Sequence, residues 1–258
     1  MNTPHHLCIL TGASRGMGQA MARQLLSTDR LLLCISRVSD EDLASRAQAM
    51  GVELVQWRQD LAEPVSAAAR LADWLATLDT GTLASATLIN NAGMIPRIGP
   101  LDDCPPDELS AALRVGLEAP MQLTAAFLRV SRGWTSAGWT GPRKVLNISS
   151  GLGRRAMAAQ APYCAAKAGL DHFTRCSALD EARHPRGARL VSLAPGVIDT
   201  GMQVQLRAGD PDAFPDRGRF VDLQQQGQLT SPDKAARRVL AWLDRPDFGA
   251  EPVADVRD

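Results

Sequence analysis

The chain has 258 residues, and its 28 basic and 28 acidic residues give a formal net charge of zero. This balance favours neither a nucleic acid nor a membrane surface as the partner. The length suits one large α/β domain with a sizeable hydrophobic core, covering residues 1–258.

The cysteines indicate the compartment and exclude two kinds of site. They are an odd number without a C-x-x-C pair, which predicts free thiols in a reducing compartment and no metal site or disulfide framework. The N-terminus has no basic flank before a long apolar run, and no apolar stretch approaches the length of a membrane span. We therefore expect a cytoplasmic protein without a membrane partner. The five cysteines are Cys8, Cys34, Cys104, Cys164 and Cys176.

A glycine-rich turn follows the first apolar run. Residues 7–10 read as a strand, residues 11–18 contain Gly12, Gly16 and Gly18, and a helix is expected from residue 19. Glycine has no Cβ and accepts positive φ, so such a turn lets the backbone approach a pyrophosphate closely. The N–H groups at the helix N-terminus then face the phosphate oxygens. Because strand, turn and helix occur together, the turn predicts a dinucleotide site.

The end of the second predicted strand, at residues 31–35, indicates which dinucleotide is bound. In dinucleotide-binding folds the residue at this strand end reads the adenosine ribose. An acidic residue would bond a free 2′-hydroxyl, whereas an arginine suits a 2′-phosphate. Arg37 stands here, and Arg15 in the glycine turn offers a second cation, so NADP(H) is the expected cofactor. The alternative for Arg37 is an ordinary solvated loop arginine.

The rest of the chain alternates between helical and strand patterns. This alternation predicts a doubly wound parallel sheet of the Rossmann type, an α/β fold in a single domain. A loop is expected at 132–142, and a polar, proline-marked segment at about 200–228. Further helices are expected at 40–50, 64–78, 107–130, 162–183 and from 231, and strands at 52–57, 87–89, 144–148, 190–193 and 252–256.

A serine, a tyrosine and a lysine follow the strand predicted at 144–148. Tyr163, the only tyrosine, comes thirteen residues after Ser150, and Lys167 lies one helical turn further on, on the same helix face. Hydride transfer to a ketone builds negative charge on the oxygen, so a proton donor must lie there. A neighbouring ammonium favours the phenolate and lowers the tyrosine pKa, and Ser150 can polarise the carbonyl. The three residues predict a catalytic site in which Ser150 and Tyr163 contact the substrate.

The order of these motifs resembles that of the short-chain dehydrogenase/reductase family. The glycine turn, the Asn-Asn-Ala-Gly run at 90–93, the tyrosine–lysine pair and the Pro-Gly turn at 195–200 cover residues 7–200. Within the family the chain is similar to the sepiapterin reductase and benzil reductase branch, which reduces vicinal dicarbonyls with NADPH. The stretches that carry this likeness are 147–151, 163–165, 199–203, 227–232 and 255–258.

The resemblance implies the cofactor contacts. Lys167 would lower the pKa of Tyr163 and hold the nicotinamide ribose, and the turn at 195–200 would contact the nicotinamide amide. Asp60 and Leu61 match the family's pair beside the adenine, although Asp60 equally suits a helix cap. The implied contacts are Thr11, Gly12, Ser14, Arg15, Gly16, Met17, Gly18, Arg37, Asp60, Leu61, Asn91, Ala92, Gly93, Tyr163, Lys167, Pro195, Gly196, Val197, Ile198 and Thr200.

One position departs from the family pattern. Gly116 stands where the family has a catalytic asparagine, which marks a helix distortion that holds a water beside the lysine. Pro120 lacks an N–H, so the carbonyl of Gly116 loses its helical partner and is expected to recruit that water, with Lys167 as donor. Two alternatives remain. Gly116 eases helix packing without a water relay, or the protein is an NADP-binding homologue with little turnover.

The expected function is NADPH-dependent reduction of a small-molecule ketone or vicinal dicarbonyl. The segment at 200–228 is expected to cover the substrate. Sepiapterin reductases hold the pterin with an aspartate near the C-terminus, and Asp255 falls at a similar place, where a surface carboxylate is the alternative reading. The resemblance also implies a homo-oligomer, either a dimer or a tetramer.

Overall fold

Seven parallel strands form one sheet, in the order β3-β2-β1-β4-β5-β6-β7, in the computed structural model, which describes residues 5–258. The strands in the middle of the sheet are apolar and almost completely buried, as expected when helices cover both faces. The strands are β1 (His5–Thr11), β2 (Arg30–Ser36), β3 (Glu53–Arg58), β4 (Leu83–Asn90), β5 (Arg143–Ile148), β6 (Arg189–Ala194) and β7 (Val253–Asp255).

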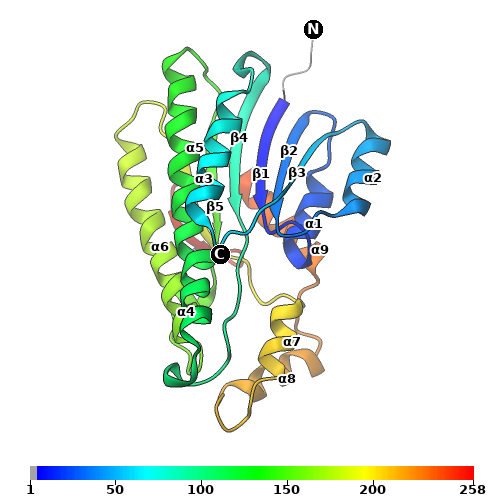
Figure 1. Ribbon diagram of the computed structural model, residues 1–258, viewed down its shortest axis with the longest axis vertical. Helices are drawn as coiled ribbons and strands as arrows, with labels where there is room; N and C mark the ends of the chain where they lie inside the picture. The colour runs from blue at the N-terminus through cyan, green and yellow to red at the C-terminus, as the bar shows by residue number, and fades with distance from the viewer. Residues whose placement is uncertain (1–4) are drawn as a thin grey trace.

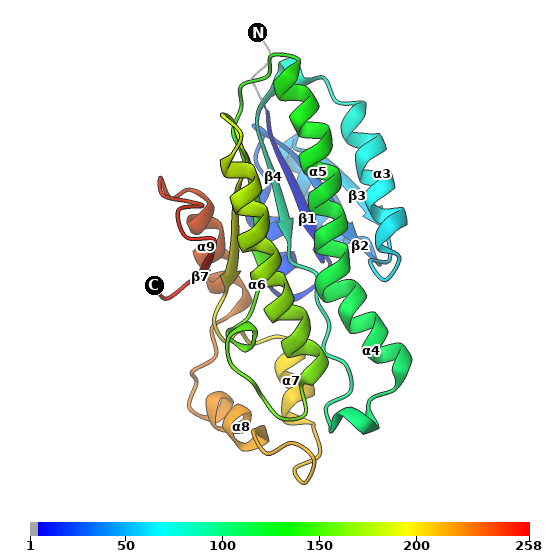
Figure 2. The same ribbon diagram turned by 90° about the vertical axis from the view of Figure 1, so that its left-hand side faces the viewer.

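Helices cover both faces of the sheet (Figures 1 and 2). Successive residues of a strand point to opposite faces. In β1, Cys8 and Leu10 therefore pack under α1 and α9, whereas Leu7 and Ile9 pack under α3 and α5. The doubly wound single domain predicted from the sequence is confirmed. The helices are α1 (Gly16–Leu25), α2 (Glu41–Met50), α3 (Pro64–Ala76), α4 (Pro106–Leu113), α5 (Ala119–Ser136), α6 (Ala161–Ala182), α7 (Gly201–Arg207), α8 (Arg217–Gln225) and α9 (Pro232–Leu243).

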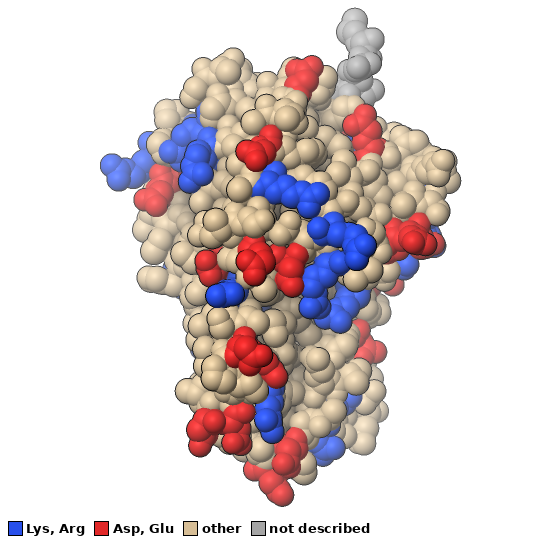
Figure 3. All heavy atoms as spheres, viewed as in Figure 1, with Lys and Arg blue, Asp and Glu red and all other residues tan. Residues whose placement is uncertain are grey.

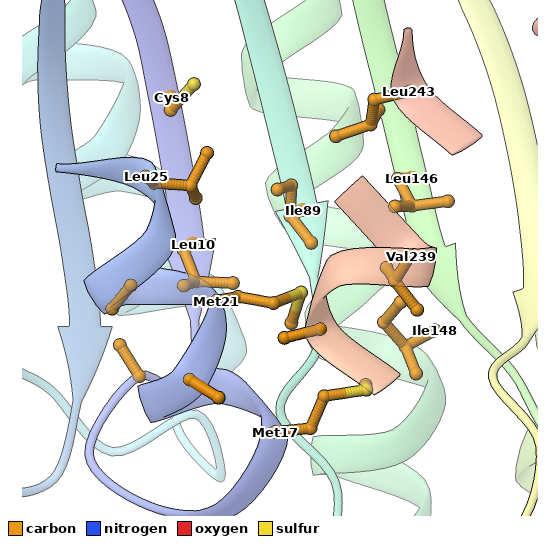
Figure 4. Packing of buried hydrophobic residues seen from close by; sticks show 14 of the residues in the cluster. Cys8, Leu10, Met17, Met21, Leu25, Ile89, Leu146, Ile148, Val239 and Leu243 are labelled. Carbon is orange, nitrogen blue, oxygen red and sulfur yellow. The ribbon is translucent and has the colours of Figure 1, made fainter. Parts of the chain in front are cut away.

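Apolar packing fixes α1, whose N-terminus belongs to the glycine turn. Met17 and Met21 of α1 project toward the sheet beside Val239 of α9 and above Ile89 and Ile148 (Figure 4). Complete burial of one such side chain stabilises a fold by about 1.5–3 kcal/mol. The N-terminus of α1 is therefore held at the carboxyl end of β1.

The helix predicted at 107–130 is divided, and it runs further than expected. A π-helical segment, η3 (Arg114–Glu118), separates α4 from α5. The loop predicted from residue 132 begins only after Ser136, so that prediction is wrong for its first five residues. Composition suggested a loop, but Trp134 is buried and packs edge-on against Trp139, with ring centroids 5.6 Å apart. This tertiary contact outweighs the weak helix propensity of the segment.

The polar segment after β6 forms two short helices, α7 and α8, beyond the end of the sheet (Figure 1). Phe214 and Phe220 stack with their ring centroids 5.7 Å apart, and Leu206 and Met157 complete a small apolar core. The ends of the segment meet where Ile198 bridges to Thr230. The sequence of this segment shows only a weak helical periodicity, because α7 and α8 bury few of their side chains.

The surface carries charges of both signs. On the face in Figure 3 acidic and basic side chains are interspersed. Across residues 5–258 no helix has the length and apolar character needed to cross a membrane, and the same residues contain no cluster of His, Cys, Asp or Glu suited to a metal ion. All five cysteines are free thiols.

Candidate active site

The predicted site residues lie at one edge of the sheet, because the carboxyl ends of parallel strands meet there. They come from loops that are far apart in sequence. Thr11 ends β1, Arg37 follows β2, Asp60 follows β3, Asn91 follows β4, Ser150 follows β5, Pro195 follows β6 and Asp255 ends β7.

The glycine turn is built for close backbone approach. Gly12 and Gly16 have φ values of 70° and 57°, in the left-handed region that favours glycine. Gly18 is restricted for another reason, since a Cβ there would lie 2.0 Å from the carbonyl oxygen of Gly12. Met17 points into the core, so only its backbone faces the turn. The turn therefore presents backbone N–H groups at the start of α1, which suits a pyrophosphate.

Asn91 and Thr11 lock this turn to the next strand end. The side chain of Asn91 donates hydrogen bonds to the carbonyl oxygens of Thr11, at 2.9 Å, and Gly12, at 3.3 Å. In return, Thr11 Oγ1 accepts from the backbone N–H groups of Asn91 and Ala92. These bonds hold the ends of β1 and β4 together. Gly93 follows directly, and a Cβ added there would lie 3.8 Å from the Nζ atom of Lys167. The contacts of residues 91–93 with the cofactor stay a prediction.

A second buried amide network, which the sequence reasoning missed, supports the strand ends. Asn90 donates to Asn147 Oδ1 at 2.8 Å and to Thr124 Oγ1 at 3.1 Å, and Asn147 donates to Thr174 Oγ1 at 2.9 Å. These bonds join β4, β5, α5 and α6 inside the core. The sequence feature that could have revealed this network is an asparagine near the end of each of two strands. Asn90 and Asn147 are paired in the register of β4 and β5.

The two arginines predicted to read the ribose line one recess. It measures about 400 Å³, and its lining includes Ser14, Arg15 and Arg37. Asp40 also lines it, but that carboxylate is occupied, because it accepts from Gln19 Nε2 at 2.7 Å and from the N–H of Leu43. Two guanidinium groups and a hydroxyl fit a phosphate, for which arginine is the preferred partner.

Asp60 and Leu61 differ in how freely they reach a ligand. Asp60 is exposed, and its Oδ1 accepts from the N–H of Ala62 at 2.9 Å, two residues on. This bond closes a local turn and does not cap a helix, because the N-cap residue of α3 is Glu63. The second carboxylate oxygen has no hydrogen bond within residues 5–258. Leu61 is buried beside α3, so its side chain belongs mainly to the core.

Ser150, Tyr163 and Lys167 converge as predicted. Tyr163 and Lys167 stand one turn apart on α6, with the Nζ atom 5.7 Å from the centre of the tyrosine ring. Lys167 is buried and donates to the carbonyl oxygen of Ile148 at 2.8 Å. Ser150 Oγ accepts from the N–H of Leu152 at 3.2 Å, which fixes its position at the start of a 3₁₀ turn, η4 (Gly151–Gly153).

Burial acts on the protonation of both Tyr163 and Lys167. Burial raises the pKa of Tyr163 above its ordinary value of 10, although a hydrogen bond with Ser150 acts in the opposite direction. Burial lowers the pKa of Lys167 to about 8. In the protein without its cofactor, desolvation of the phenolate therefore outweighs the hydrogen bond with Ser150 at Tyr163. The decrease expected from the ammonium and the oxidised nicotinamide concerns the cofactor complex and stays a prediction.

The turn after β6 lies beside the glycine turn. Gly196 has a φ of 84°, in the left-handed region. Thr200 reaches the glycine turn, since a Cβ on Gly16 would lie 3.4 Å from its Cγ2 atom. Backbone bonds from Val197 and Asp199 to Thr230 hold the turn in place. Thr200 thus lies beside the glycine turn. The nicotinamide contacts of Pro195 to Thr200 stay a prediction.

Asp255 is paired within its own strand end. Its two carboxylate oxygens accept from Arg257, at 2.7 Å from Nε and 2.6 Å from Nη2. These bonds and the nearby Arg154 hold the pKa of Asp255 below its usual value. A substrate would have to compete with Arg257 for this carboxylate.

Gly116 lies inside the π-helical segment η3, where a helix distortion was expected. It is buried, and a Cβ there would lie 3.1 Å from the Cβ of Ala166, the residue before Lys167. This contact supports the alternative in which Gly116 permits close packing of η3 against α6. Lys167 itself donates to Ile148 rather than toward η3.

Substitution of Gly116 tests whether the missing asparagine side chain limits turnover. We expect Gly116→Asn to change kcat only modestly, since the helix distortion is present without the amide. Gly116→Ala is the matched control, because it adds the same crowded Cβ without the amide. A hundredfold gain in kcat for the asparagine variant alone, about 2.7 kcal/mol, would show that the missing amide limits the native enzyme.

A comparison with known families identifies the class of protein. The family model described as short chain dehydrogenase matches residues 6–211. The chain therefore belongs to the short-chain dehydrogenase family, as its motifs predicted, and is an oxidoreductase by family.

Known relatives extend the likeness over almost the whole chain. Benzil reductase ((S)-benzoin forming) of Bacillus cereus is 30% identical over 240 residues, which cover 93% of this chain and 94% of that protein. Sepiapterin reductase of Xenopus laevis is 31% identical over 272 residues, covering 98% and 95%. A solved metagenomic short-chain oxidoreductase in complex with NADP is 25% identical, covers 99% of this chain and 96% of that chain, and has a TM-score of 0.71. The predicted branch of the family is confirmed.

Proposed function

We propose that this protein is an NADPH-dependent reductase of ketones or vicinal dicarbonyls, with Tyr163 as the general acid. The observation that carries the proposal is the convergence of Ser150, Tyr163 and a buried Lys167 beside the glycine turn. The relatives named for benzil and sepiapterin support a dicarbonyl substrate.

The chemistry divides between the cofactor and three side chains. The nicotinamide, when bound, supplies the hydride. Ser150 donates a hydrogen bond to the substrate carbonyl and polarises it. Tyr163 gives its proton to the same oxygen as charge develops, and its raised pKa keeps that proton in place before reaction. Lys167 holds the nicotinamide ribose and stabilises the phenolate that remains.

The surroundings of the catalytic residues favour an apolar substrate. Leu152, two residues after Ser150, and Cys164, next to Tyr163, both pack against the small apolar core formed by Met157, Leu206 and the two phenylalanines. A carbonyl compound with aromatic or aliphatic flanks would gain free energy from contact with such a wall. This supports a diketone with apolar substituents.

The choice of cofactor rests on Arg37 and Arg15. We expect NADPH to bind at least tenfold more tightly than NADH, because charge-assisted hydrogen bonds to the 2′-phosphate are worth about 1.5–3 kcal/mol. Fluorescence titration of both cofactors measures this. Arg37→Asp should remove the preference, whereas Arg237→Asp on the exposed side of α9, with the same change in charge, should keep it. Equal affinities in the wild type would contradict the assignment.

The second candidate is an NADP-binding protein with little turnover, which Gly116 favours. A screen of aromatic and aliphatic diketones with NADPH, followed at the absorbance of the reduced cofactor, separates the two candidates. Cofactor binding without turnover across the screen would favour the second. The cytoplasmic location, the dimeric or tetrameric state and a role for Asp255 in substrate binding stay predictions.

A further inference from the structure

We propose that Asp171 is a positioning residue that keeps the buried Lys167 protonated, and that Arg154 ties this carboxylate to the loop carrying Ser150. The inference rests on the proposed function, since it concerns the lysine of the proposed catalytic set. It assigns a role to two charged residues that the sequence reasoning did not single out.

Asp171 lies on the same face of α6 as Tyr163 and Lys167. Tyr163, Lys167 and Asp171 are spaced four residues apart, so they stand one above another on one side of the helix. Asp171 is only 2% exposed. Its Oδ1 accepts from Ser192 Oγ at 2.7 Å, and its Oδ2 lies 3.3 Å from Arg154 Nε. A buried carboxylate with two defined partners keeps a fixed position below the lysine.

Arg154 joins this carboxylate to two other elements. It follows the 3₁₀ turn that begins after Ser150, and its Nη2 donates to the carbonyl oxygen of Ala254 in β7 at 2.8 Å. Gly153 allows the approach, because a Cβ there would lie 2.8 Å from Asp171 Oδ2 and 3.0 Å from the carbonyl oxygen of Lys167. The Ser150 loop is thus pressed against α6 at the level of the lysine and the aspartate.

Among residues 5–258, few charged groups face Lys167. On α6 they are Tyr163, neutral while protonated, and Asp171, whose charge raises the pKa of the lysine against the effect of burial. From β5 the neighbour is the uncharged carbonyl of Ile148, and from the loop after β4 it is Gly93. Arg154 Nε lies 3.3 Å from Asp171 Oδ2, so its positive charge offsets part of the field of this carboxylate. Asp171 is therefore the anion that counters the desolvation of Lys167.

The experiment titrates the lysine directly. The chain has three lysines, Lys144, Lys167 and Lys234, so NMR of the full-length protein labelled with ¹³C at lysine Cε gives three signals, and Lys167→Met identifies one of them. In Asp171→Asn, which can still accept from Ser192, we expect the pKa of Lys167 to fall by about one unit or more. Asp180→Asn, on the exposed side of the same helix, removes the same charge and should leave it unchanged.

Arg154→Gln gives the opposite sign. Loss of this cation leaves the charge of Asp171 less compensated, so the pKa of Lys167 should rise. A purely structural role would disturb both variants in the same direction. An unchanged Lys167 titration in Asp171→Asn, or shifts of the same sign in both variants, would overturn the proposal.

The pH profile of diketone reduction adds a second readout. In Asp171→Asn the decrease in kcat/KM at high pH should begin about one pH unit lower than in the wild type, with little change near pH 6.5. If the wild type reduces no diketone, the proposed function fails, but the NMR titration still decides the role of Asp171.

Discussion

Replacement of Tyr163 by phenylalanine is expected to lower kcat for a diketone by about 10²–10⁴-fold, the usual contribution of a general acid. The ring and its packing stay, so the dissociation constant for NADPH should change little. Steady-state kinetics and a cofactor titration by fluorescence measure the two effects separately. A phenylalanine variant with nearly normal kcat would mean that the proton comes from another group.

The same residue provides a direct pH test. Tyr163 is the only tyrosine in the chain, so ultraviolet difference spectra follow its ionisation alone. Burial raises its pKa in the cofactor-free protein, so the midpoint of its ionisation should lie above the ordinary tyrosine value of about 10. Addition of NADP⁺ brings a positive nicotinamide to the site and should lower that pKa. A tyrosine that ionises below pH 10 without cofactor would contradict the structural account.

Replacement of Gly18 by alanine is expected to weaken NADPH binding at least tenfold, about 1.4 kcal/mol, and to lower the free energy of unfolding by about 1–3 kcal/mol. The added Cβ would meet the carbonyl oxygen of Gly12 at 2.0 Å and the side-chain nitrogen of Asn91 at 2.5 Å. Both belong to the rigid strand ends, so the turn itself must move. Fluorescence titration and denaturant unfolding measure the two effects.

A second glycine provides the matched control. Gly133 lies in the last turn of α5, and a Cβ there would meet nothing within 4 Å. Alanine at this position should stabilise the protein by about 0.5–1 kcal/mol through helix propensity and leave cofactor affinity unchanged. If Gly18→Ala behaved like Gly133→Ala, the close approach at the turn would not be required.

Local patterns in the sequence were sufficient for the motifs and for most elements. The apolar runs at 7–10 and 31–35 are too short for a helix and lie beside turn signals, and these two features together predict buried strands. The helix expected from residue 231 is α9, and Ser231 caps it by accepting from the N–H of Lys234. Such features depend on neighbours within one turn or one strand.

Features that depend on distant partners were predicted poorly. The helical extension to Ser136 requires Trp139 as a packing partner, and the helices α7 and α8 require a shared apolar core. The pKa directions of Tyr163 and Lys167 followed burial, which a spacing of four residues does not reveal. Arg154 and Asp171 stand seventeen residues apart, and no local pattern relates them.

The sequence by itself determined the family and the order of the elements along the chain, and it singled out Ser150, Tyr163 and Lys167 as the proposed catalytic residues, because these features depend on residue types at short, definite spacings. Only the tertiary structure decided how these groups ionise and what holds them. Protonation depends on the solvent and charge that the whole fold leaves around each side chain. Burial lowers the pKa of Lys167, and the carbonyl oxygen of Ile148, which the fold brings to it from β5, accepts a hydrogen bond from its Nζ atom.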